Sequence, residues 1–61
     1  METANLEDHA VGLELQIVEL VERKERALLQ HDLAAAERIQ REIDPLQLEL
    51  ATTAERIAAK H

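Results

Sequence analysis

The aliphatic residues of this chain recur three and four positions apart, and this spacing limits its possible folds more than any other feature. In the second half the pattern consists of Ala36, Ile39, Ile43, Leu46, Leu50, Thr53 and Ile57. Steps of three and four place these side chains on one stripe of an α-helix, in the heptad pattern of helices that pack side by side. β-Branched residues nowhere alternate with polar ones, as they do in half-buried strands. The pattern therefore predicts an all-α fold.

A matching stripe occupies the first half of the chain. It consists of Leu6, Ala10, Leu13, Ile17, Leu20, Lys24 and Ala27. We call the two stripes together the seam. Continued through a single helix, the first stripe would reach Ala34 and Arg41, whereas the second stripe uses Ala36 and Ile43. This change of phase indicates a turn, although a stutter in one long helix of a parallel coiled coil would produce the same shift.

The residues between and before the stripes favour a turn. Asp32 is a suitable N-cap for a second helix, and Asn5 is a suitable N-cap for the first. We expect one domain over residues 1–61, with a helix at about 5–30, a turn at about 30–32 and a helix at about 33–59. The predicted architecture is an antiparallel two-helix hairpin of coiled-coil type.

A hairpin folded at this turn pairs positions whose numbers add to 63, which brings the two stripes of the seam together. Leu13 then shares a layer with Leu50. The same register predicts the ion pairs Glu7–Arg56, Glu22–Arg41 and Glu25–Arg38. Agreement of apolar and charged residues on one register is expected of a sequence that specifies one fold.

Pro45 lies inside the second stripe. The stripe continues through it without a change of phase, and at about 100° per residue Pro45 falls nearly opposite the centre of the stripe. This favours one helix with a mild kink on its solvent side. The alternative is a break, in which Asp44 is an N-cap, Pro45 is the first helical residue and Gln47 completes a capping box.

The chain has 61 residues, no cysteine and no aromatic residue. A domain of this size buries too little apolar surface to offset its conformational entropy without a disulfide, a metal or a partner. Without cysteine, association is the most accessible source of added stability. We expect a homodimer in which two hairpins form a four-helix bundle.

Acidic residues are concentrated in the first third of the chain. Residues 1–22 hold six acidic side chains and no Lys or Arg, whereas residues 23–61 hold seven of each sign. Nucleic acids and anionic membranes require a basic surface, so neither is an expected partner, while a basic protein is compatible. No basic segment precedes an apolar run and no apolar stretch is long enough to span a bilayer, so we expect a cytoplasmic location.

A second apolar stripe lies beside the seam in the first half. It consists of Val11, Leu15, Val18 and Leu29. The combined apolar arc is wider than one neighbouring helix can cover, which indicates contact with a further helix. Glu7 and Glu14 lie within the same arc. The candidate partner-binding residues are therefore Glu7, Val11, Glu14, Leu15 and Val18.

Little in the sequence points to chemistry. There is no serine or cysteine, and nothing resembles a nucleophile accompanied by a general base and an orienting acid, so we expect no enzyme and assign no catalytic residue. No glycine-rich phosphate loop is present, and we expect no cofactor. The three His residues lack the spacing of zinc ligands and the Glu-x-x-His pattern of di-iron bundles, so no metal ligand is assigned. A line of carboxylates at Glu7, Glu14 and Glu25 leaves a metal-binding bundle open as an alternative.

Residues 20–37 contain a charged helical segment that ends in Ala27-Leu28-Leu29 and continues through His31-Asp32-Leu33 into a second amphipathic segment. This region resembles the helix–turn–helix of flagellar-type (type III secretion) export chaperones, in which a helix ending in Ala-Leu-Leu is followed by a turn, commonly Gly-Asp-Leu. His31 replaces the turn glycine here. The resemblance covers less than a third of the chain, and it implies a small, acidic, helical protein that binds secreted partners through amphipathic helices.

Together these features favour a non-enzymatic helical protein-interaction module, such as a chaperone or adaptor for a helical or basic protein. Two alternatives stay open. One is a purely structural dimer whose second apolar stripe is covered by self-association, and the other is the metal-binding bundle.

Overall fold

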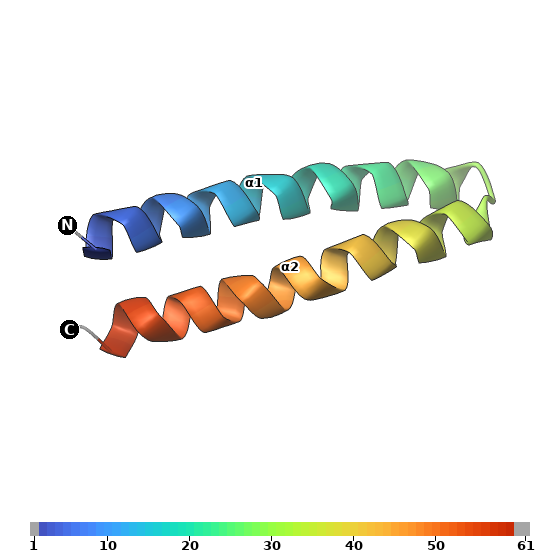
Figure 1. The fold of residues 1–61 in the computed structure, drawn as a ribbon. Helices are drawn as coiled ribbons and strands as arrows, with labels where there is room; N and C mark the ends of the chain where they lie inside the picture. Colours follow the sequence, from blue (N-terminus) through green and yellow to red (C-terminus); the bar gives the residue numbers. More distant parts are fainter. Residues whose placement is uncertain (1, 60–61) are drawn as a thin grey trace.

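A computed structural model describes residues 2–59 of the chain, with side chains from residue 5 onward, and consists of two helices. α1 spans Glu2–Leu29 and α2 spans Leu33–Ala59. The two helices run antiparallel and lie side by side, with both chain ends at the same end of the molecule (Figure 1). The predicted all-α hairpin is confirmed, and a single long rod is excluded. Assembly of two hairpins into a four-helix bundle stays a prediction.

The turn between the helices is a Schellman motif, in which a residue of left-handed conformation reverses the chain. His31 takes that position with a φ of 59°. Its N–H donates to the carbonyl of Leu28 (3.0 Å), and the N–H of Asp32 donates to the carbonyl of Ala27 (2.8 Å). The Oδ1 of Asp32 then accepts a hydrogen bond from the N–H of Ala35 (3.1 Å), which confirms the predicted N-cap of α2.

The seam forms the core of the hairpin. All of its residues are buried or half-buried in the folded chain. The most buried are Leu13, Ala27, Ala36, Ile43 and Thr53, and Ile43 is only 1% exposed. Lys24 of α1 reaches α2 beside the seam, where its Nζ donates to Oε1 of Gln40 (2.6 Å). This contact agrees with a register in which paired positions add to 63.

Thr53 brings a hydroxyl group into this aliphatic core. Its side chain is 4% exposed. The Oγ1 donates a hydrogen bond to the carbonyl of Glu49 in the preceding turn (2.9 Å), so the buried hydroxyl has a partner. Thr53 can therefore occupy a seam position without leaving an unsatisfied polar group.

The second helix runs through Pro45 without interruption, which confirms one helix and rejects the break. Asp44 does not cap a new helix, because its Oδ1 accepts a hydrogen bond from Nε2 of Gln40 (2.6 Å). Proline lacks the N–H that would bond the carbonyl of Arg41. Arg41 and Pro45 are both exposed, so water can satisfy this carbonyl.

The expected N-cap of the first helix is wrong. α1 begins at Glu2, and Asn5 lies inside it. Glu2 and Ala4 are strong helix formers, so the helix extends by about one turn beyond the position at which a capping side chain first appears.

The three predicted ion pairs are also wrong. Among residues 5–59 the one ion-pair contact joins Nε2 of His9 to Oε2 of Glu49 (2.7 Å), and both side chains are about half exposed. Positions that add to 63 lie at the same height along the hairpin, but height does not fix direction. At about 100° per residue, Glu22 and Arg41 both point away from the neighbouring helix. By the same geometry, the members of the other two pairs lie on opposite flanks of the hairpin.

Candidate interaction surface

The predicted second stripe lies on the surface of α1. Val11, Leu15 and Val18 are 55%, 60% and 51% exposed, and Glu7 and Glu14 are exposed beside them. The single neighbouring helix contacts the seam and leaves this outer surface of α1 uncovered. A stripe of three large aliphatic side chains, bordered by carboxylates, is therefore available to a further molecule.

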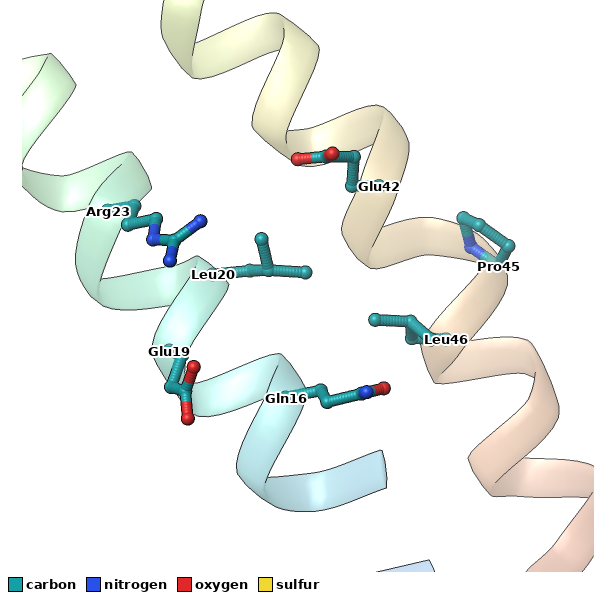
Figure 2. Close-up of a pocket in the computed structure, with 7 residues that line it drawn as sticks. All are labelled: Gln16, Glu19, Leu20, Arg23, Glu42, Pro45 and Leu46. Carbon is teal, nitrogen blue, oxygen red and sulfur yellow. The ribbon is translucent and has the colours of Figure 1, made fainter. Parts of the chain in front are cut away.

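A shallow groove marks one broad face of the hairpin. Gln16, Glu19 and Arg23 line it from α1, and Glu42 and Pro45 line it from α2. The seam residues Leu20 and Leu46 complete the lining, and they point toward each other across the space between the helices (Figure 2). The groove has a volume of about 400 Å³. The groove leaves no local pattern in the sequence, because its lining combines residues of both helices that lie far apart along the chain.

Heptad spacing extends this face along both helices, and we call it the groove face. Its Asp, Glu, Lys and Arg residues are Glu19, Arg23, Arg26, Arg38, Glu42, Glu49 and Arg56. The groove face thus carries three acidic residues and four arginines, and its net charge is close to zero.

The opposite broad face has a different composition. It carries the positions that flank the seam on the other side, and we call it the acidic face. Its acidic residues are Glu7, Glu14, Glu25, Glu37 and Asp44. Its one base is the half-buried Lys24 of the seam, whose Nζ donates to Gln40, which in turn donates to Asp44. Its apolar residues are Val11, Val18, Val21, Leu28, Leu33, Ala51, Ala54 and Ala58. The predicted stripe therefore forms one edge of a wider acidic and apolar surface that α2 shares.

The turn end of the hairpin adds exposed leucines. Leu28 and Leu33 are 43% and 63% exposed, and Leu29 beside them is 81% exposed. The reversal at His31 leaves Leu28 and Leu33 on the acidic face, next to the turn.

Other chemical features of the described residues are few. The hydroxyl of Thr52 donates to the carbonyl of Leu48 (3.0 Å), and that of Thr53 is likewise bonded to the backbone. Within residues 5–59 no three His, Asp or Glu side chains come together in a way that could hold a metal ion. Neither described helix is apolar over a length that would cross a bilayer.

Comparisons with protein families, with curated proteins and with solved structures give no match to this chain.

Proposed function

We propose that this chain is a small helical protein-interaction module, and that the outer surface of α1 binds a helical segment of another protein. The observation that carries the proposal is the exposure of Val11, Leu15 and Val18 in the folded hairpin. These side chains follow one face of a regular helix, which is the arrangement through which helices recognise an amphipathic partner.

The charge beside the stripe supports a partner with basic side chains. Glu7 and Glu14 border the stripe, and residues 1–22 hold no Lys or Arg that would neutralise them. Attraction between such a surface and a basic helix mainly accelerates association and selects the partner. The resemblance of residues 20–37 to export chaperones agrees with this role, because those proteins bind partners through amphipathic helices.

A designed peptide tests the proposal. The probe is a synthetic amphipathic helix with leucine on one face and lysine along both flanks, and its matched control carries glutamate in place of lysine. Binding of each peptide to the protein is measured by isothermal titration calorimetry. We expect the lysine peptide to bind, its affinity to fall as added salt shortens the Debye length below about 8 Å, and the glutamate peptide not to bind.

A pair of variants locates the binding surface. Val18→Asp places a charge in the stripe, whereas Leu48→Asp places the same charge at an exposed leucine on the outer side of α2. We expect Val18→Asp to abolish binding and Leu48→Asp to leave it nearly unchanged. Equal effects of the two variants, or an absence of peptide binding to the unmodified protein, would contradict the proposal.

A structural homodimer is the second candidate function. Few of the described residues are buried in the isolated hairpin. A second copy that covered the stripe would therefore add the apolar burial that a short chain lacks. Light scattering coupled to size exclusion decides between the two. A mass near 6.9 kDa would contradict the dimer, and a mass near twice that value would support it.

A further inference from the structure

The proposed binding surface on α1 continues across the hairpin onto α2. We propose that a basic amphipathic helix lies along the whole acidic face, between α1 and α2, and completes a three-helix bundle. This inference rests on the proposed function and adds to it the half of the site that α2 supplies.

The apolar residues of the acidic face are distributed as a third helix requires. Large side chains come from α1 and from the turn end, where Val18, Leu28 and Leu33 are all exposed. The residues of α2 toward the open end are small, at Ala51, Ala54 and Ala58. Small residues allow the backbone of an added helix to approach closely, so the face offers large side chains on one side and space on the other.

The charges of the two broad faces identify the occupant. The acidic face carries five acidic residues and a single base, the half-buried Lys24 whose amine donates to Gln40, whereas the groove face carries three acidic residues and four arginines. A second copy that docked acidic face to acidic face would bring like charges together. A helix with lysine or arginine along its flanks would instead pair with carboxylates contributed by both α1 and α2.

The accessible surface of the chain is consistent with a missing partner. The hairpin exposes 4745 Å². A compact chain of 6.9 kDa exposes about 4,000 Å² by the usual scaling of surface with mass, so the excess is roughly 700 Å². A specific interface of standard size buries about 800 Å² on each partner. The excess follows from the elongated shape of 44 × 14 × 12 Å, in which each helix packs against only one neighbour, and a docked third helix would cover an area of this order.

The length of the hairpin sets the length of the probe. The molecule is 44 Å long, and a helix rises about 1.5 Å per residue, so a partner of about 29 residues spans it. The probe is a lysine-flanked leucine peptide of that length, and its binding is again measured by calorimetry.

The decisive variants lie on α2, far from the stripe in sequence. Ala51→Arg places a bulky base on the acidic face, and Thr52→Arg places the same side chain at the next position, which heptad spacing assigns to the groove face. We expect Ala51→Arg to weaken peptide binding at least about tenfold and Thr52→Arg to change it less than about twofold. Ala58→Arg, one heptad further on, repeats the test at a second position. Circular dichroism verifies that each variant keeps its helical content.

Three results would overturn the inference, and they have different meanings. If Val18→Asp abolishes binding while the Ala51 and Ala58 variants bind normally, the partner contacts α1 alone, and the proposed function stands without its extension. If the peptide does not bind the unmodified protein, the proposed function fails as well. If the chain alone sediments as a dimer that Ala51→Arg dissociates, a second copy occupies the acidic face.

Discussion

Leu13 and Leu15 are the same residue type, two positions apart in one helix, yet Leu13 is 5% exposed and Leu15 is 60% exposed. The difference is one of direction, because α1 has a single neighbour and a step of two residues turns a side chain by about 200°. In a two-helix fold, hydrophobicity therefore does not decide burial. Residues of the seam stabilise the hairpin, while equally apolar residues outside it remain available for binding.

The largest expected effect separates these two leucines directly. Leu13→Ala should reduce the free energy of unfolding by about 2–5 kcal/mol, because it leaves a cavity in the seam. Leu15→Ala should change it by less than about 0.5 kcal/mol, because the side chain is already solvated. Urea denaturation followed by circular dichroism measures both. A double-mutant cycle of Leu13 with Leu50 should also show strong coupling, since the register places them in one layer. Similar losses for Leu13→Ala and Leu15→Ala would show that a partner covers α1 in the protein as purified.

Pro45 extends the comparison of buried and exposed positions to the exposed side of α2. Pro45→Ala restores an N–H to the helix interior at a site that makes no contribution to the seam, so the variant should gain up to about 3 kcal/mol of unfolding free energy. Thermal denaturation reports the change as a higher midpoint. A loss of stability would mean that the proline ring, which lines the groove, contributes packing that outweighs the missing hydrogen bond.

Thr52 and Thr53 repeat the comparison with a polar residue. Both hydroxyls donate to the carbonyl four residues earlier, but only Thr53 is buried. Thr53→Ala should cost about 1–2 kcal/mol through lost packing in the seam. Thr52→Ala should gain up to about 0.5 kcal/mol, because alanine has the higher helix propensity. Chemical denaturation of the two variants in parallel gives the difference, and a gain at both positions would place Thr53 outside the core.

The smallest expected effect concerns the turn, which belongs neither to the buried seam nor to the exposed helix surfaces. His31 is exposed and adopts a left-handed conformation that disfavours residues with a Cβ. His31→Gly should therefore raise the free energy of unfolding by about 1 kcal/mol, while His31→Ala should give no such gain. Equal responses to glycine and alanine in thermal denaturation would show that the backbone strain at this position is negligible.

The fold could be predicted from the sequence because its determinants are periodic. The seam, the turn at residues 30–32 and the cap at Asp32 each leave a local pattern in the sequence. The unchanged phase of the stripe likewise predicted a helix that continues through Pro45. The start of α1 could not be placed, since nothing in the first residues opposes a helix. The ion pairs failed because a pairing sum gives height along the hairpin and omits rotation about each helix axis.

The candidate surface was predictable only in part. Val11, Leu15 and Val18 follow one helix, so their shared direction can be counted along the chain. The groove and the contribution of α2 to the acidic face combine residues from two helices. Their positions depend on which flank of α1 lies on the same broad face of the hairpin as which flank of α2. That pairing of flanks is known only from the packed structure.

The turn that ends α1 and begins α2 also sets the order in which this chain can fold. Asp32 completes the end of α1 and caps α2, so the first contacts between the helices, at Ala27 and Ala36, join residues close together in the chain. Closing a short loop costs little entropy. Each further layer of the seam then forms next to a layer that is already in contact, so it closes only a few more residues. Folding should therefore proceed as a zipper from His31 toward the open end, at the microsecond-to-millisecond rates typical of helical proteins with local contacts.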